Sequence, residues 1–407
     1  MMDHEWIQAP IGIDSRRWVS RVDCRTVLVV AHTMATCHRL LDVVELVECD
    51  PRVQVVFTVA PDVFNVGVKH HLRALGAVVL SWEQATRETF DVVIAASHGG
   101  LHELHGPLMV MAHGAGRAKI AIRPARGGPP LRTPTVYGLD AQRLARDGRI
   151  LASKILLAHE KERDVLSRQC PEALGAAVVA GDVCFDRLVA SLPLRERYRR
   201  ALGIDDDQQL VVVSSTWGHH GLFGGDPGLL PQIMNQLSPR RFRVATLLHP
   251  AVWGAHGQRQ IRAWTQDCQE AGMLLPDPCD DWRAVVAAAD VLVGDYGSVT
   301  AYAAAIGLPI LCRTMRGPEK VAPGSPQALA IDSAGRLDPS RSIRAQVRAA
   351  RPVDFPRVAA AITSRPGRSR GLVRHALYQL LGLREPGRHR ALAAVAVPQS
   401  TAAGDRS

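Results

Sequence analysis

Two histidines each follow an apolar segment that is expected to form a buried strand. His113 follows Leu108–Ala112, and His249 follows Phe242–Leu248 and stands before Pro250. An imidazole with a pKa near 6.5 can take a proton from a hydroxyl at neutral pH, so His113 is a candidate general base. Proline favours an extended backbone at the preceding residue. We therefore expect the ring of His249 to project from the carboxyl edge of its sheet and to bind a ligand there.

Basic residues accompany the first of these histidines. Arg117 and Lys119 follow His113 closely in the sequence. Their positive charges favour the neutral imidazole and suit anionic oxygens, so both are candidate anion contacts. Another histidine, His98, ends the preceding strand and is followed by two glycines. We interpret His98 as part of a glycine-rich turn rather than as a catalytic group.

A strand-to-helix turn in the second half has the composition of a phosphate site. The apolar run Val291–Gly294 is followed by Asp-Tyr-Gly-Ser and then by an alanine-rich segment. With Ser298 as N-cap, the N–H groups of residues 298–300 would face outward at a helix N-terminus, which favours an anion. A capped turn of this kind fits the motif equally well. The candidate donor-binding residues here are Asp295, Gly297, Ser298, Val299 and Thr300.

A third strand end carries hydroxyl groups. The run Val211–Val213 leads into Ser214, Ser215 and Thr216, and glycines follow. Small hydroxyl residues and glycines let a phosphate approach the backbone, so Ser215 and Thr216 join the donor-binding candidates. The pair His219-His220 suggests a metal less strongly, because neighbouring side chains on an extended chain point oppositely. We predict no metal site.

These residues require parallel strands that end at a common sheet edge. Short β-branched runs alternate with longer Ala/Leu/Arg-rich segments, which is typical of parallel strands buried under helices. We predict two α/β domains in series, residues 1–190 and 191–335, then arginine-rich helices over 336–384 and a disordered tail over 385–407. The Gly/Pro/Arg-rich segment 123–134 is expected to be a mobile loop after the His113 turn. The expected strands are Thr26–Ala31, Val53–Thr58, Ala77–Leu80, Asp91–Ala95, Leu108–Ala112, Lys154–Ala158, Leu210–Ser215, Phe242–Leu248, Val291–Gly294 and Pro309–Cys312.

The net charge of the 407-residue chain, +10, lies in one segment. Residues 341–390 contain twelve arginines, no lysine and two acids, so the remainder is neutral. A neutral body argues against a surface that tracks nucleic acid, and we expect no nucleic-acid partner. The segment Arg341–Arg390 suits a peripheral contact with anionic lipid. A solvated terminal segment explains the same composition.

The cysteines and the apolar segments indicate the cellular compartment in which the protein works. The eight cysteines are scattered without a CxxC pair, which predicts neither disulfides nor zinc. The first residues lack an apolar signal region, and the longest nearly uncharged apolar stretch, Val299–Cys312, is short for a bilayer span. We expect a cytoplasmic protein that can contact the inner face of the cell membrane.

The order of five motifs resembles one enzyme family. The chain contains Ala112-His-Gly-Ala-Gly116, Gly181-Asp-Val-Cys-Phe-Asp-Arg-Leu188, Ser214-Ser-Thr-Trp217, Leu248-His-Pro250 and Asp295-Tyr-Gly-Ser298. Their order is similar to that in the CDP-glycerol glycerophosphotransferases of teichoic-acid synthesis, which have the GT-B fold. The resemblance implies two Rossmann-like domains facing each other across a cleft.

The resemblance also implies a mechanism. His113 would be the general base, and His249, Ser298 and nearby backbone amides would hold the diphosphate of a nucleotide-activated donor such as CDP-glycerol. A hydroxyl acceptor would attack and CMP would leave, without a resident cofactor. The chain departs from the family in having Ala115–Ala118 after the His-Gly and Gly297 before Ser298. A sugar nucleotide fits the same site, and the alternatives are a UDP-sugar epimerase or a silent nucleotide- or partner-binding relative.

Overall fold

The computed structural model divides the chain into two compact units. It describes residues 6–12, 15–121, 135–313, 321–352, 354–387 and 392–398. The first unit comprises Met1–Cys184 and Thr363–His389, and the second comprises Phe185–Ile362 and Arg390–Ser407. The chain therefore passes between the units more than once. This differs from the predicted division, in which residues 336–384 stood apart from both domains.

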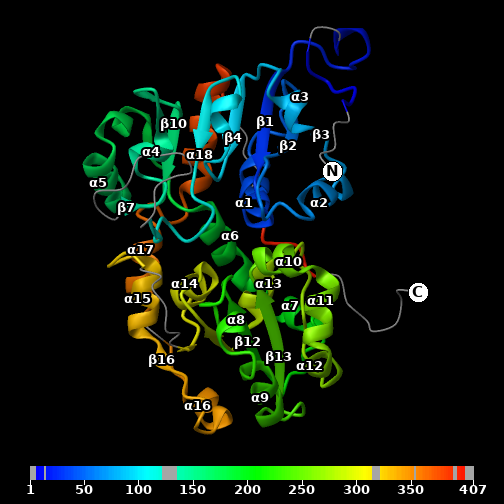
Figure 1. Cartoon of the computed structure of the whole chain (residues 1–407), viewed down its shortest axis with the longest axis vertical. Helices are drawn as coiled ribbons and strands as arrows, with labels where there is room; N and C mark the ends of the chain where they lie inside the picture. The colour runs from blue at the N-terminus through cyan, green and yellow to red at the C-terminus, as the bar shows by residue number, and fades with distance from the viewer. Residues whose placement is uncertain are drawn as a thin grey trace. The chain divides into compact units, whose positions relative to one another are not determined.

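The first unit is built on a parallel sheet of seven strands (Figure 1). Its inner strand β1 is fully buried from Val27 to Ala31, because apolar residues of the strand face helices on both sides. The order is β11-β10-β5-β4-β1-β2-β3. The bounds are β1 Arg25–Ala31, β2 Val53–Val59, β3 Val79–Leu80, β4 Val92–Ala95, β5 Leu108–Val110, β10 Lys154–Leu157 and β11 Ala177–Val179.

Helices from both ends of the chain cover this sheet. The helix α18 (Ser369–Leu381) packs beside α1 (Met34–Val44) and against β4, although it lies more than 300 residues along the chain from α1. Its buried Tyr378 donates a hydrogen bond to Asp50 (2.8 Å). The other helices are α2 Val68–Ala74, α3 Trp82–Ala85, α4 Ala141–Leu144 and α5 Glu160–Gln169, with two short hairpins, β6–β7 (Ile120–Ala121, Thr135–Val136) and β8–β9 (Ala145–Arg146, Arg149–Ile150).

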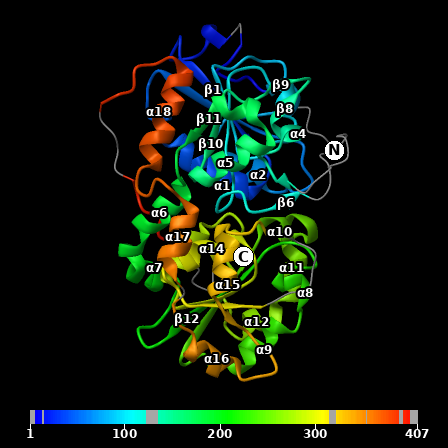
Figure 2. The same ribbon diagram turned by 90° about the vertical axis from the view of Figure 1, so that its left-hand side faces the viewer.

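The second unit has a parallel sheet of five strands in the order β13-β12-β14-β15-β16. Helices again cover it, as the view in Figure 2 shows for α9 and α16. The strands are β12 Gln209–Ser215, β13 Phe242–Leu248, β14 Val291–Gly294, β15 Ile310–Cys312 and β16 Gly335–Arg336. The helices are α6 Val183–Ser191, α7 Arg195–Ala201, α8 Leu222–Gly225, α9 Leu229–Gln236, α10 Pro250–His256, α11 Gln258–Trp264, α12 Gln266–Glu270, α13 Trp282–Ala288, α14 Ser298–Ala305, α15 Pro326–Ser333, α16 Ile343–Ala349 and α17 Phe355–Ile362.

The structure differs from the sequence prediction in the C-terminal tail, and it divides one helical segment of the second unit. The helices α11 and α12 are separated at Thr265, whose hydroxyl donates to the Ile261 carbonyl (2.8 Å). In the predicted tail, residues 392–398 are described, and buried Val395 bonds to Ser191 and Tyr198. The predicted loop 123–134 lies outside the described residues.

Candidate functional site

Three histidines stand at the carboxyl ends of adjacent strands in the first unit. His32 follows β1, His98 follows β4, and His113 follows β5, and these strands are neighbours in the sheet. Parallel strands place their carboxyl ends along one edge, so the three rings share that edge. His32 was not among the residues predicted to form a site. The same signal, an apolar strand ending in histidine, was present there.

The ring of His113 is oriented by a backbone carbonyl. Its Nδ1 lies 2.9 Å from the carbonyl oxygen of Ala96. A carbonyl oxygen only accepts, so Nδ1 is the donor, and the neutral ring carries its lone pair on Nε2. Desolvation by the surrounding protein lowers the pKa of His113, the hydrogen bond to Ala96 opposes this shift, and the charge of Arg39 lowers the pKa further, although the side chain retains an exposed surface. A neutral Nε2 near pH 7 can accept a proton.

The candidate anion contact Arg117 is mainly engaged within the protein. Its backbone N–H and its Nη1 donate to the Glu162 carboxylate at 2.7 and 3.2 Å, and Nη1 also reaches the Leu156 carbonyl (3.2 Å). Its side chain is only 4% exposed. Arg117 therefore fastens the turn after His113 to the start of α5. Lys119, by contrast, is an exposed residue of this turn.

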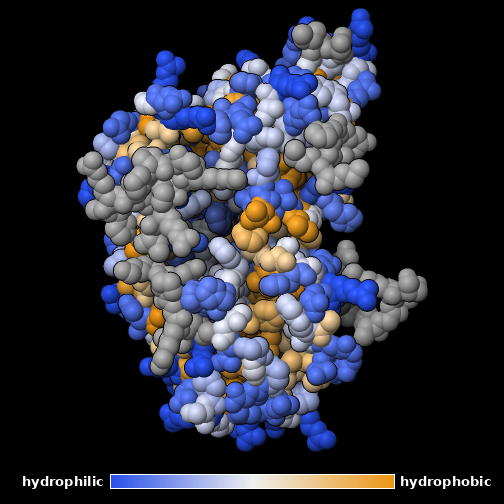
Figure 3. Space-filling model, in the orientation of Figure 1, coloured by the Kyte–Doolittle hydropathy of each residue, from blue (hydrophilic) through white to orange (hydrophobic). Residues whose placement is uncertain are grey.

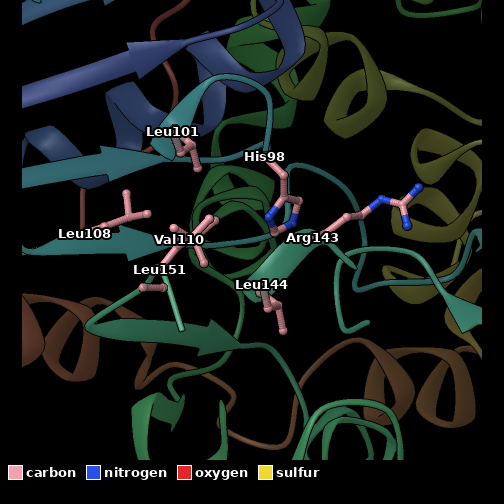
Figure 4. Close-up of a pocket in the computed structure, with 8 residues that line it drawn as sticks. His98, Leu101, Leu108, Val110, Arg143, Leu144 and Leu151 are labelled. Carbon is pink, nitrogen blue, oxygen red and sulfur yellow. The ribbon is translucent and has the colours of Figure 1, made fainter. Parts of the chain in front are cut away.

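A small pocket lies beside His98 (Figure 4). Its walls are mostly apolar, and Figure 4 shows the guanidinium of Arg143 directed away from them. That guanidinium lies over the ring of Tyr137 (4.2 Å) and pairs with Asp140. Burial, followed by the charges of Arg117 and Arg143, lowers the pKa of His98 to about 3. The lining residues are His98, Leu101, Leu108, Val110, Arg143, Leu144, Leu151 and Ala152.

In the second unit, His249 has the opposite hydrogen-bonding arrangement. Its backbone is extended (φ −54°, ψ 136°), as expected before Pro250, and its Nδ1 accepts from the N–H of Ala251 at 3.1 Å. In the neutral ring the proton is therefore on Nε2. The ring caps α10 and presents a donor, which suits a phosphate oxygen rather than proton abstraction.

Asp295 organises the second unit's candidate site from within. It is 3% exposed, and its carboxylate accepts from the N–H groups of Thr216 (2.8 Å), Leu222 (2.9 Å) and Gly297 (3.0 Å). Burial raises its pKa, while these amide bonds oppose the rise. Asp295 therefore fixes the loop after β12 to the turn after β14. This geometry indicates that Asp295 positions the two loops, whereas the sequence predicted that it contacts the donor directly.

The turn after β14 opens α14 differently from the prediction. Gly297 is the N-cap residue, and Ser298 is the first helical residue. No side chain caps this helix. The hydroxyl of Ser298 accepts from Gln327 Nε2 (3.3 Å). The first N–H groups of a helix, here those of Ser298, Val299 and Thr300, have no acceptor within it. Thr300 is buried against Gly294, so only the other two stand at a partly exposed surface.

The loop after β12 is held tightly by its glycines. A Cβ on Gly221 would lie 2.3 Å from the Thr216 carbonyl oxygen, and one on Gly224 would lie 2.5 Å from that of Gly218. The buried hydroxyl of Ser215 donates to Thr216 O and accepts from Phe223 N, both at 2.8 Å. Ser215 is therefore engaged within the loop. Thr216 is partly exposed beside Gly297.

Comparisons with known proteins identify the fold. No protein family matches the sequence, and no curated protein matches it. Among solved structures, a variant of the wall teichoic acid polymerase TagF matches with a TM-score of 0.56 at 12% identity, covering 88% of this chain and 89% of that one. The same polymerase with CDPG gives 0.54 at 12% identity, covering 88% of both chains.

Two further neighbours are structures of nucleotide-sugar-related proteins, one of them described as an epimerase. A putative UDP-N-acetylglucosamine 2-epimerase from Listeria monocytogenes gives a TM-score of 0.51 at 12% identity, covering 90% of this chain and 100% of that one. The S. aureus MnaA-UDP structure gives 0.50 at 11% identity, with the same coverages. At these identities the likeness concerns the fold, and the chain has the GT-B-like fold expected from the sequence.

Proposed function

We propose that this protein is a GT-B transferase that moves a glycerophosphate or glycosyl group from a nucleotide-diphosphate donor to a hydroxyl acceptor. The observation that carries the proposal is the pair of opposite imidazole arrangements. His113 Nδ1 is committed to the Ala96 carbonyl, which leaves a lone pair on Nε2. His249 Nδ1 accepts from Ala251, which leaves a proton on Nε2. One ring suits a general base, and the other suits an anion.

The proposed step divides the work between these groups. The acceptor oxygen attacks the phosphorus next to glycerol, or the anomeric carbon of a sugar, and its proton passes to His113 Nε2. The bond to the nucleotide breaks, and CMP or a nucleoside diphosphate leaves with the bonding pair. His249 Nε2–H and the N–H groups that open α14 would stabilise the negative charge on the phosphates. The donor is a substrate, and the proposal needs no resident cofactor.

A UDP-sugar epimerase is the second candidate, because one of the structural neighbours, from Listeria monocytogenes, is described as a putative UDP-N-acetylglucosamine 2-epimerase. Its chemistry needs acidic catalytic groups. Among the described residues, three acids near the candidate sites are engaged within the protein: Asp182 pairs with Arg39, Glu162 with Arg117, and Asp295 accepts three backbone amides. This favours transfer. A protein that binds a nucleotide without turnover is the third candidate.

Two successive experiments test the proposal: the first identifies the donor, and the second measures turnover. Thermal shifts with CDP-glycerol, CDP-ribitol, UDP-sugars and GDP-sugars should single out one donor, because saturation at 100 Kd adds about 2.7 kcal/mol of stability. Release of CMP, UDP or GDP is then followed with candidate acceptors. A rise in Tm with one nucleotide but no release with any acceptor supports the silent binder. Conversion of UDP-sugar to its epimer supports the second candidate.

We also propose that a membrane contact, if the protein makes one, involves only part of the arginine-rich segment. Arg365, Arg370 and Arg374 of the first unit each lie within 4.0 Å of a carboxylate. The arginines at 341, 344, 348, 351 and 357 belong to the second unit and are exposed. We call these five the arginine surface. No helix in the described part of the chain is both long and apolar enough to cross a bilayer.

A further inference from the structure

A buried arginine holds the residue that follows the candidate base. Arg39 lies on α1 and its side chain is 5% exposed. Its Nη2 donates to the carbonyl oxygen of Gly114 at 3.0 Å, and its Nη1 donates to Asp182 Oδ1 at 2.8 Å. The planar guanidinium thus spans two segments that are far apart in the sequence. One of them is the His113–Gly114 turn.

Asp182 lies where the chain leaves the first unit. The first unit's long segment ends at Cys184, two residues later, and its second segment begins at Thr363. The preceding residue, Gly181, has φ +84°, and a Cβ there would lie 3.0 Å from Thr363 Oγ1 and 3.1 Å from the Arg365 carbonyl oxygen. The outgoing and the returning segments therefore pack against each other at Gly181. We call this contact the crossing.

We propose that Arg39 is a positioning residue for His113, and that Asp182 couples Arg39 to the crossing. The carbonyl of Gly114 is held by a guanidinium that is itself fixed by a carboxylate at the crossing. Any rearrangement of the segments that join the two units would then move the turn that carries the base. The effect of this coupling on catalysis rests on the proposed role of His113 as the base. The structural coupling of Asp182 and Arg39 to the His113–Gly114 turn does not depend on that role.

Charged and titratable groups surround His113 from several elements. Arg39 lies on α1, His32 follows β1, His98 follows β4, and Arg117 follows His113 itself. Asp182 and Glu162 partly compensate the two arginines. Removal of the Arg39 charge should therefore make protonation of His113 easier. Removal of the Asp182 charge alone should make it harder, because an uncompensated cation remains.

The first test measures the pKa of His113 by NMR in the full-length chain with isotope-labelled histidine, with the resonance assigned from His113→Gln. We expect Arg39→Met to raise this pKa and Asp182→Asn to lower it. The matched control is Arg25→Met, which removes the Arg25–Asp91 pair at the opposite end of β1. An unchanged pKa in folded Arg39→Met would overturn the proposal.

Loss of one partner can unfold a protein that contains a buried ion pair. The double variant Arg39→Met/Asp182→Leu replaces both charges by apolar groups and keeps the test interpretable. It should fold and should still raise the His113 pKa, because the arginine is the partner bonded to the His113 turn. Arg39→Lys keeps the charge but not the two-pronged geometry, so it should leave the pKa near the wild-type value and still slow turnover.

The second test perturbs the crossing without touching His113. Gly181→Ala strains a left-handed backbone and forces Thr363 and Arg365 to shift. We expect a change in the His113 chemical shift and pKa. The control is Gly175→Ala, where a Cβ meets nothing within 4 Å and φ is not left-handed. A His113 signal identical in Gly181→Ala and wild type would refute the coupling. If His113→Gln retains turnover while these shifts are observed, the proposed base fails and the coupling stands.

Discussion

At the scale of single residues, hydrogen-bond partners distinguish two histidines that look alike in the sequence. Both follow a strand, and both use Nδ1 within the protein. The partner of His113 is a carbonyl acceptor and that of His249 is an N–H donor, so their Nε2 atoms differ in protonation. The difference predicts different defects when each ring is replaced.

Replacing His113 should impair the chemical step. We expect His113→Gln to reduce kcat by about 10²- to 10⁴-fold, the usual contribution of a general base, with a small effect on donor binding. His249→Gln should mainly weaken donor binding, since its role is to hold the donor. Initial rates and donor titrations separate the two. Equal kcat for His113→Gln and wild type would exclude His113 as the base.

The lowered pKa of His113 also predicts the pH dependence of turnover. The base is active when neutral, so the rate should fall with decreasing pH only below the folded-state pKa, which is itself below 6.5. Activity at pH 6.5 should therefore remain above half of its plateau. A rate profile in kcat checks this, and an acid limb centred above pH 6.5 would contradict the expected environment.

His98 should make the first unit sensitive to acid. Its folded-state pKa of about 3 lies below the unfolded value, so the unfolded chain binds the proton first as the pH falls through 6.5. The stability present above pH 6.5 is lost progressively down to about pH 3. Near pH 4.5 the loss amounts to about 2.7 kcal/mol. Urea unfolding of His98→Gln should show a shallower pH slope than wild type, whereas the exposed control His70→Gln should not.

At the scale of elements, one carboxylate connects the ends of β12 and β14. Asp295 accepts amide bonds from the loop after β12 and from the turn that opens α14. An asparagine in its place must turn an NH₂ group toward at least one of these N–H donors. The candidate phosphate site should then lose its shape even though the substitution changes few atoms.

We expect Asp295→Asn to destabilise the second unit by about 3 kcal/mol, since hydrogen bonds to charged groups contribute about 1.5–3 kcal/mol each and a buried donor is left facing a donor. Donor binding should weaken in parallel. Chemical denaturation and donor titration measure both effects. The control is Asp206→Asn, which alters an exposed acid of the same unit. Unchanged stability in Asp295→Asn would contradict the positioning role.

The elements predicted from the sequence are those whose pattern is strong locally. Strands such as β13 and β14 have continuous apolar, β-branched cores, and their predicted bounds match the structure. The helix α17 falls within the helical range predicted over 336–384, but its assignment to the second unit depends on packing against α14 and α15, which the sequence does not show. Ser298 was expected as a cap from its residue type, but the extended N-cap residue is Gly297, held by Asp295. His32 and Arg39 matter through contacts with residues 67 and 75 positions away, which no local pattern encodes.

At the scale of the whole molecule, the segment that holds the net charge is divided between the two units. The arginine surface belongs to the second unit, where Arg348 lies over Phe242 at the start of β13. His249 follows the other end of the same strand, about 23 Å away for seven residues at 3.3 Å each. On the side shown in Figure 3, the surface over α9 and α16 is mostly hydrophilic. A contact through these arginines would leave the candidate donor site uncovered.

Vesicle sedimentation tests that contact. If the arginine surface binds anionic lipid, replacing Arg341, Arg344, Arg348 and Arg351 by Gln should remove most binding to phosphatidylglycerol vesicles, at about 1 kcal/mol for each charge near the surface. The matched control replaces the ion-paired Arg365, Arg370 and Arg374. Binding should also weaken with salt. If the wild-type protein does not bind the vesicles, or if both variants bind equally, the arginine surface is not a lipid contact and only keeps the segment solvated.

The return of α18 to the first unit limits how the chain can be divided into independent fragments. A gene fragment that ends near residue 190 would encode the seven strands of the first sheet without the helix that packs on α1 and β4. A fragment that begins there would carry that helix without its partners. No single break in the gene therefore separates two complete units.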